Sequence, residues 1–227
     1  MKHIITLAVA AGLALTGCQA SSAAAGKYVE APIAERVADE DAGKRVAILA
    51  GGCFWCVEAV FSHTKGISGV VSGYHGGSAA TATYEDSNTG VTGHAEAVQI
   101  TYDPAVIRYD QILQIFFSVV ADPTVRNRQG PDIGPQYRAA LIPVNDEQRE
   151  VAAAYLAQME ASGKWSKPIV TEIEDHFQFF PAEDYHQDFV AINPRHPYVL
   201  AWSVPKVDGL EKLYPQFYRE EFLRDHK

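Results

Sequence analysis

Cysteine is scarce in this chain of 227 residues, which contains three. Cys18 stands near the start, Cys53 and Cys56 form a close pair, and no cysteine follows Cys56. A structural zinc site takes four ligands, and the chain has neither a second cysteine pair nor a histidine pair at the usual spacing. We therefore expect no metal, and the Cys53–Cys56 pair is the candidate for any thiol chemistry.

The chain also lacks an excess of basic over acidic residues, and it lacks long apolar segments. The net charge of −9 argues against binding to nucleic acid and against electrostatic adhesion to anionic lipid. The uncharged apolar run at residues 4–15 is shorter than the roughly 20 residues that a membrane-spanning helix needs. No internal repeat is visible, and a hydrophobic content of 47% can fill one core. Residues 45–227 are therefore expected to form one domain and a monomer.

The N-terminal run follows a basic residue, Lys2, which is typical of a secretory signal peptide. It ends in the sequence LTGC, which resembles the lipobox of bacterial lipoproteins. The resemblance implies a signal peptide at residues 1–17, a lipid on Cys18 and a place in the cell envelope, on the periplasmic face. Gln19 favours the outer over the inner membrane. An ordinary signal peptide with a chance cysteine is the alternative.

Residues 18–44 are rich in alanine, serine and acidic residues and have no long apolar period. We predict a flexible, solvated tether there. Beyond it, strands are expected at residues 45–52, 67–77, 93–104 and 168–175, and helices at 53–65, 109–122, 145–163 and, as a short last helix, 183–192. Because these elements alternate without the strict rhythm of a parallel sheet, the expected class is α+β, with helices packed on a mixed sheet.

The sequence GGCFWC, residues 51–56, carries the strongest chemical signal. Two glycines permit a sharp turn from strand to helix, which puts Cys53 at a helix start, where unpaired N–H groups favour a thiolate. Cys56 follows one turn later, within disulfide reach. Phe54 and Trp55 are then expected to wall a small apolar pocket. A static disulfide would close almost no loop and stabilise little, so redox catalysis is the better use of the pair.

A candidate acid lies in the sequence HAEAVQITY, residues 94–102. Strict alternation puts Glu96 on the same strand face as Val98, Ile100 and Tyr102, which is the bulkier face. If that face is buried, the carboxyl of Glu96 has a raised pKa and holds a proton near neutral pH, as a general acid requires. A glutamate salt-bridged at a strand end is the alternative.

Five motifs, in this order, resemble those of type A peptide methionine sulfoxide reductases: GGCFWCVEAVF, SGYHGG, TGHAEAVQITYDP, RNRQGPDIGPQYRAA and PAEDYHQDF. The resemblance covers about residues 45–194. It implies a two-layer α/β sandwich with a ferredoxin-like mixed sheet. It also implies reduction of the S epimer of methionine sulfoxide, free or in proteins, with electrons from a thioredoxin-like partner and no cofactor.

Site residues carried over from the family are assigned one by one. The resemblance implies that Cys53 is the nucleophile and that Glu96 protonates the sulfoxide oxygen. Tyr74 and Tyr137 are implied to be the phenols that bind this oxygen, and Asp132 to be an acid in their network. Phe54 and Trp55 are implied to form the wall that receives the substrate methyl group.

The chain departs from most of the family at Cys56, where glycine is usual, and in having no recycling cysteine near its C-terminus. Cys56 is therefore the expected partner of Cys53 in a recycled disulfide, and an outside thiol is the alternative. Two other functions are alternatives. A thiol–disulfide oxidoreductase would use the same pair without Glu96, and a non-catalytic lipoprotein would bind peptides at Phe54 and Trp55.

Overall fold

A computed structural model describes residues 28–224. The expected signal peptide, the lipidation site Cys18 and the first part of the expected tether lie outside the described residues. Within 28–224, no helix is long and apolar enough to cross a bilayer.

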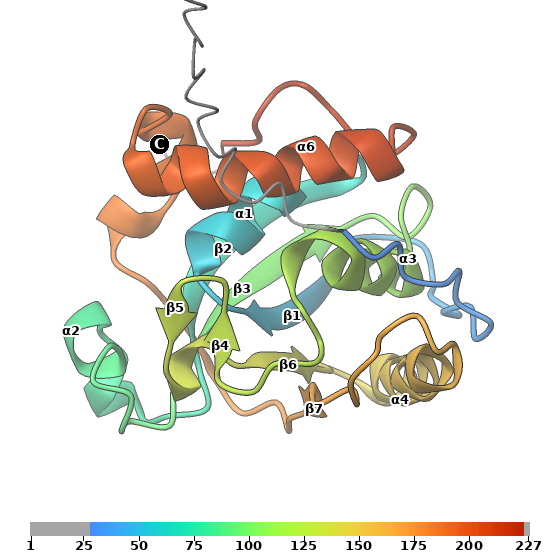
Figure 1. Cartoon of the computed structure of the whole chain (residues 1–227), viewed down its shortest axis with the longest axis horizontal. Coiled ribbons are helices and arrows are strands. Elements are labelled where there is room, and N and C mark those ends of the chain that lie inside the picture. The colour runs from blue at the N-terminus through green and yellow to red at the C-terminus, as the bar shows by residue number, and fades with distance from the viewer. Residues whose placement is uncertain (1–27, 225–227) are drawn as a thin grey trace, which may run out of the picture.

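A mixed sheet of six strands forms the centre of the domain (Figure 1). Its order is β7-β6-β1-β3-β2-β8, and every neighbouring pair is antiparallel except β6 and β7. The strands are β1 (Arg45–Gly51), β2 (Ile67–His75), β3 (Ala95–Tyr102), β6 (Ala139–Ile142), β7 (Glu172–Ile173) and β8 (Phe179–Pro181). A separate hairpin pairs β4 (Arg128–Gln129) with β5 (Asp132–Ile133).

The central part of the sheet has the ferredoxin-like arrangement that was expected. The chain runs β1, α1 (Phe54–Ser62), β2, β3, α3 (Tyr109–Ile115) and β6, and these strands lie in the order β6-β1-β3-β2. Helix α3 continues as the π-helical turn η2 (Phe116–Val120), and α4 (Asp146–Ala161) packs beside α3. The α+β class is therefore confirmed.

The burial of β3 follows the alternation in its sequence. Val98, Ile100 and Tyr102 belong to the main core, together with residues of α1 and α3. Ala95 and Ala97 face a smaller cluster on the other side of the sheet. The bulky face of β3 is thus the face that carries helices, and Glu96 lies on it.

Short elements complete the chain. They are η1 (Ala79–Thr81), α2 (Tyr84–Ser87), η3 (Pro135–Tyr137), η4 (Asp184–His186), α5 (Phe189–Ile192), η5 (Val199–Ser203) and α6 (Val204–Leu213). The expectation that residues 183–192 form the last helix was wrong, because η5 and α6 follow. In Figure 1, α6 crosses above α1, which lies between it and the sheet.

The described part of the expected tether, residues 28–44, is packed rather than free. It has no helix or strand, yet Ala31, Ala34 and Ala38 are buried against the core. Side chains of α3 and α4 bind its backbone: Asp110 accepts the N–H of Ala38 at 3.0 Å, and the Tyr155 hydroxyl donates to the Pro32 carbonyl at 2.7 Å. The expectation of flexibility fails here because small side chains let the segment approach the helices closely.

Candidate active site

The two cysteines lie where β1 passes into α1. Gly52 makes the turn with a φ of +84°, and a Cβ there would come within 2.4 Å of the Gln129 side chain. Glycine is therefore required both for the conformation and for space. Cys53 follows as the N-cap residue of α1, as the motif predicts, and its side chain is partly exposed. Cys56 is only 3% exposed.

Both cysteines are free thiols, and each changes the pKa of the other. The Cys56 amide also donates to the Cys53 carbonyl at 3.0 Å, which fixes the one-turn spacing. A disulfide is able to span two residues at this spacing.

The protonation of the pair differs from the expected one. Burial raises the pKa of Cys53, and Cys56 and Glu96 raise it further. The first helical N–H group, that of Phe54, does not serve a thiolate, because it donates to Glu96 Oε2 at 2.9 Å. The hydrogen bond from Cys53 and the charge of Lys206 lower the pKa of Cys56 to about 7, against the effect of burial. The surroundings therefore favour the thiolate form of Cys56 more than that of Cys53.

Glu96 points inward from β3, as the alternation predicts. It is 4% exposed and lies opposite Tyr74 across the β2–β3 pair. Burial raises the pKa of Glu96 to about 8, with further contributions from the charges of Asp132 and Cys56, although the Phe54 N–H opposes the shift. The carboxyl therefore holds its proton at neutral pH and is able to act as an acid.

Phe54 and Trp55 have different surroundings. Phe54 is 1% exposed, with its ring centre 5.9 Å from that of Tyr74 and 4.9 Å from that of His186. Trp55 is partly exposed, stacks on Phe189 with ring centres 3.6 Å apart, and donates from Nε1 to His186 Nδ1 at 3.1 Å. Trp55 is therefore able to offer an apolar surface beside Cys53. The role of Phe54 as a wall stays a prediction.

The two predicted phenols come from different elements and differ in how firmly they are held. The Tyr74 hydroxyl donates to Glu183 at 2.8 Å. The Tyr137 hydroxyl, at the end of η3, donates to the Asn88 side chain at a longer 3.3 Å. Burial raises the pKa of Tyr137, and the charge of Glu96 raises it further, so this hydroxyl stays protonated. Of the two, Tyr137 is the freer to bind a ligand oxygen.

Asp132, on β5, connects the predicted site to the C-terminal segment. It accepts a hydrogen bond of 2.5 Å from the Tyr198 hydroxyl, which in turn lies 4.0 Å from Cys56 Sγ. Burial raises the pKa of Asp132, and the hydrogen bond and Lys206 oppose this. Asp132 therefore lies in a polar network beside the two thiols.

Sequence reasoning missed Tyr84, His186 and Tyr198. The Tyr84 ring centre lies 4.6 Å from that of His186, whose ring also packs against Phe54, so Tyr84 belongs to the surroundings of the site. Glu183 accepts the Tyr84 amide as well as the Tyr74 hydroxyl, so it connects the two tyrosines. No periodicity in the sequence relates these residues to Glu96.

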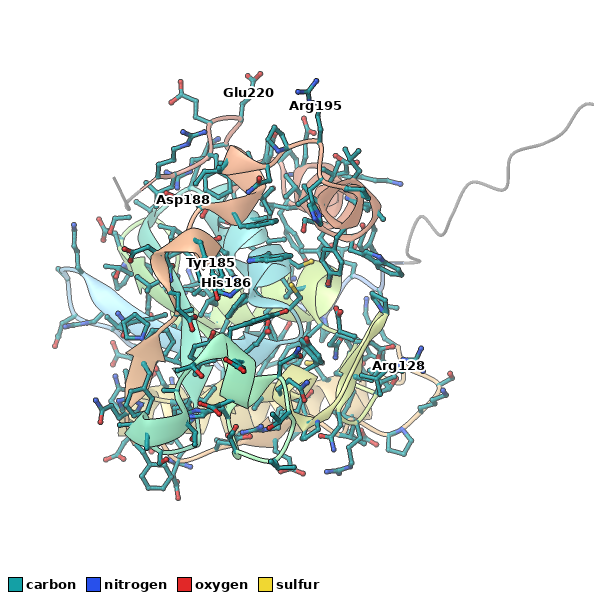
Figure 2. The ribbon with its side chains drawn as sticks, turned by 90° about the vertical axis from the view of Figure 1, so that its left-hand side faces the viewer. Arg128, Tyr185, His186, Asp188, Arg195 and Glu220 are labelled. Carbon is teal, nitrogen blue, oxygen red and sulfur yellow. The ribbon has the colours of Figure 1, made fainter. Side chains whose placement is uncertain are left out.

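His186 lies beside α1, near the middle of the molecule in Figure 2, where Arg128 marks the β4–β5 hairpin. Burial lowers the pKa of His186, so the ring is neutral at pH 7. Because its Nδ1 accepts from Trp55, the other nitrogen carries the hydrogen. His186 belongs to the PAEDYHQDF motif, but the sequence did not show its partner. The structure shows that His186 holds the Trp55 side chain by a hydrogen bond.

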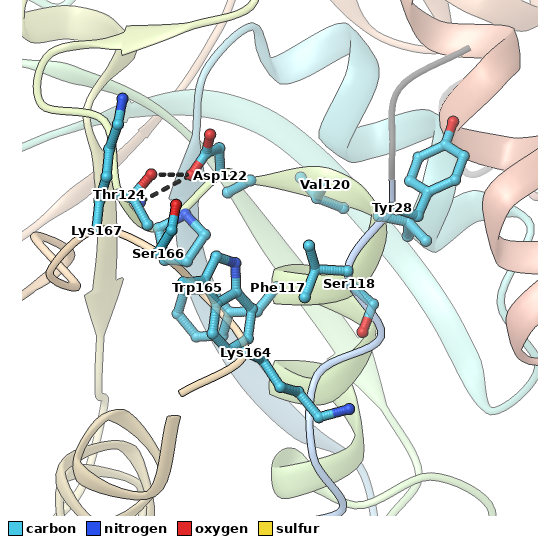
Figure 3. Close-up of a pocket in the computed structure, with 14 residues that line it drawn as sticks. Tyr28, Phe117, Ser118, Val120, Asp122, Thr124, Lys164, Trp165, Ser166 and Lys167 are labelled. Carbon is cyan, nitrogen blue, oxygen red and sulfur yellow. Dashed lines mark hydrogen bonds between the residues drawn. The ribbon is translucent and has the colours of Figure 1, made fainter. Parts of the chain in front are cut away.

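A small cavity of about 20 Å³ opens beside the cysteines. It is lined by residues from β1, α1, the β4–β5 hairpin and the C-terminal segment, among them Cys53, Cys56, Asp132, Tyr198 and Lys206. A much larger cavity of about 640 Å³ lies elsewhere, between η2 and residues 164–167, with Trp165 and Phe117 in its wall (Figure 3). None of the predicted site residues lines the larger cavity.

Residues 28–224 contain no group of three or more histidine, cysteine, aspartate or glutamate side chains that could hold an ion.

The chain is similar to known proteins in sequence and in structure. The family model described as peptide methionine sulfoxide reductase matches residues 45–217. "Peptide methionine sulfoxide reductase MsrA 2" of Mesorhizobium japonicum is 50% identical over 179 residues, which cover 79% of this chain and 92% of the relative. The protein named MsrA from Picrophilus torridus is 47% identical over 174 residues, which cover 77% and 96%.

Two solved structures are also similar. Mxr1 from Saccharomyces cerevisiae in reduced form has a TM-score of 0.62 and 32% identity, and the match covers 72% of this chain and 93% of that one. Methionine sulfoxide reductase A of Corynebacterium diphtheriae has a TM-score of 0.57 and 30% identity, over 68% and 77%.

Proposed function

Because this chain belongs to the peptide methionine sulfoxide reductases of type A, an enzyme family that reduces the S epimer of methionine sulfoxide, we propose that it does so through the Cys53–Cys56 pair. The observation that carries the proposal is the buried, protonated Glu96, which contacts the first N–H of the helix that begins after Cys53. An acid and a sulfur nucleophile side by side are what transfer of a sulfoxide oxygen requires.

The first step moves the oxygen. Cys53 Sγ attacks the sulfoxide sulfur while Glu96 gives a proton to the oxygen. Tyr137 hydrogen-bonds to this oxygen, together with Tyr84 in place of the predicted Tyr74, whose hydroxyl already donates to Glu183. The S–O bond breaks, methionine leaves, and Cys53 becomes a sulfenic acid. The proton lost by the Cys53 thiol restores Glu96, so one thiol and one sulfoxide become one sulfenic acid and one thioether.

The second step closes a disulfide. Cys56 thiolate attacks Cys53 Sγ, a sulfur–sulfur bond forms, and the hydroxyl leaves as water after taking a proton. The one-turn spacing of the two cysteines, held by the bond from the Cys56 amide to the Cys53 carbonyl, supports this assignment because a disulfide is able to span it. An external dithiol of the thioredoxin type then reduces the disulfide and is itself oxidised.

The site of action is proposed to be the cell envelope, where the enzyme would repair oxidised proteins under oxidative stress. The LTGC sequence supports a lipid on Cys18 and Gln19 supports the outer membrane. Cys18 precedes Tyr28 by ten residues, which span at most about 35 Å when extended. Since residues 28–44 are packed on the domain, the anchor would hold the active site near the membrane surface. Replacing Cys18 by serine should abolish labelling with a fatty acid and release the protein from membranes.

An assay resolved by epimer tests the reaction. Purified enzyme with dithiothreitol should consume the S epimer of a methionine sulfoxide peptide and leave the R epimer unchanged. A Glu96→Gln variant should lose this activity but keep any exchange with protein disulfides. Loss of both activities, or of neither, would contradict the role of Glu96 and favour a general thiol–disulfide oxidoreductase.

A further inference from the structure

The C-terminal segment places two groups on Cys56 that the cycle above does not use. Ser203 ends η5 and is fully buried, and its hydroxyl lies 3.2 Å from Cys56 Sγ. Lys206 follows one helical turn later on α6 and lines the small cavity that contains both cysteines. Its ammonium donates to the Val120 carbonyl, which keeps the side chain directed inward.

The two sulfurs of the pair are therefore unequal. Cys53 is partly exposed beside the cavity, whereas Cys56 is 3% exposed and covered by the C-terminal segment. Cys53 is therefore the more accessible of the two to an incoming thiolate. The Ser203 hydroxyl contacts Cys56 Sγ, and Lys206 lines the cavity beside it, where its positive charge favours the Cys56 thiolate.

We propose that Ser203 and Lys206 are positioning residues that set the direction in which the disulfide opens, so that the reductant bonds to Cys53 and Cys56 leaves. This rests on the proposed function, because it requires the Cys53–Cys56 disulfide. The thiolate of a dithiol attacks Cys53 Sγ, the bond between the two cysteines breaks, and its electron pair goes to Cys56 Sγ. The second thiol of the reductant then attacks the mixed disulfide and releases Cys53, and the reductant leaves oxidised.

The chemistry of thiol exchange favours this direction. A thiol of lower pKa leaves faster, and the pKa of Cys56 is lowered to about 7 by the hydrogen bond from Cys53, the charge of Lys206 and the hydroxyl of Ser203. In the disulfide the contribution of Cys53 is lost, while Ser203 and Lys206 remain. The same two groups also favour the thiolate that attacks the Cys53 sulfenic acid.

Trapping of the mixed disulfide tests the proposal on the full-length enzyme. The enzyme is oxidised with a methionine sulfoxide peptide, treated briefly with glutathione at pH 7, and quenched with N-ethylmaleimide. Tandem mass spectrometry then locates the glutathione and the maleimide. We expect glutathione on Cys53 and maleimide on Cys56. Glutathione on Cys56, or equally on both cysteines, would overturn the proposal.

The same samples separate this inference from the proposed function. If no Cys53–Cys56 disulfide is found before glutathione is added, the proposed cycle fails, and with it the inference that rests on it. If the disulfide is present and opens at Cys56, only the inference fails.

Two variants test the positioning residues directly. Lys206→Met and Ser203→Ala should each slow the opening of the disulfide by dithiothreitol, by up to about tenfold, and should move the thiolate absorbance titration at 240 nm to higher pH. Lys206→Arg should restore both, and Lys212→Met, an exposed position on the same helix, should change neither. A slower opening with an unchanged titration would show a merely structural effect and overturn the assignment.

Discussion

The surroundings of the two cysteines at the start of helix α1 differ in what they offer to sulfur. On the side of Cys53, β3 supplies a protonated acid, Glu96, and the partly exposed Trp55 supplies an apolar surface. On the side of Cys56, the C-terminal segment supplies a buried hydroxyl and an ammonium. The first side suits an oxygen that has to be protonated, and the second suits a sulfur that has to be negative. Cys53 and Cys56 are only three residues apart, yet the surroundings of Cys53 suit oxygen transfer and those of Cys56 suit disulfide chemistry.

Loss of Cys53 should have the largest effect of any single change. Cys53→Ser removes the attacking sulfur, so reduction of a methionine sulfoxide peptide should fall by several orders of magnitude. Chromatographic measurement of methionine released per enzyme checks this. Residual activity above about one per cent of wild type would count against the nucleophile assignment.

Glu96→Gln comes next and tests the acid on the Cys53 side. General acids typically contribute about 10²- to 10⁴-fold, so a single turnover should slow by that order. In the wild type, a carboxyl with a raised pKa is protonated below that pKa. The rate should therefore fall as pH rises through about 8, and this loss should vanish in the variant. A variant that retains the same alkaline limb would assign it to another group.

Cys56→Ser should separate oxygen transfer from disulfide formation. The nucleophile and the acid remain, so a single turnover should still release one methionine and leave a sulfenic acid that dimedone traps. Repeated turnover with thioredoxin should collapse, whereas dithiothreitol is small enough to reach the sulfenic acid and should restore much of the rate. Turnover with thioredoxin at the wild-type rate would show that Cys56 has no resolving role.

The smallest expected effect concerns a residue away from both cysteines, and it serves as a control for stability. Glu40, in the packed segment 28–44, accepts hydrogen bonds from the Tyr102 hydroxyl and from the Tyr109 amide. Glu40→Ala should lower the free energy of unfolding by about 1–3 kcal/mol, because it leaves these buried donors unpaired. Urea denaturation measures the loss, and the single-turnover rate should not change. An unchanged unfolding midpoint would mean that the segment contributes nothing to stability.

Part of this structure was predictable from sequence rules that act over a few residues. Cys53 at the start of α1, the helix at 146–161 and the inward direction of Glu96 were predictable, because turn glycines, helix capping and strand alternation each act within a few residues. Asn145 indeed accepts the Gln148 amide at 2.9 Å. The packing of residues 28–44 was not predictable, because it depends on partners more than 70 residues away, such as Asp110 and Tyr155.

The sequence by itself determined which atoms are available: two thiols one turn apart, an acid on the bulky face of a strand, and no later cysteine. Only the tertiary structure decided how they are charged. The Phe54 N–H, which the sequence suggested for a Cys53 thiolate, is taken by Glu96, and Ser203 and Lys206 approach Cys56 from about 150 residues away. Protonation depends on burial and on charges within a few ångströms, and those distances exist only after the C-terminal segment has folded over α1.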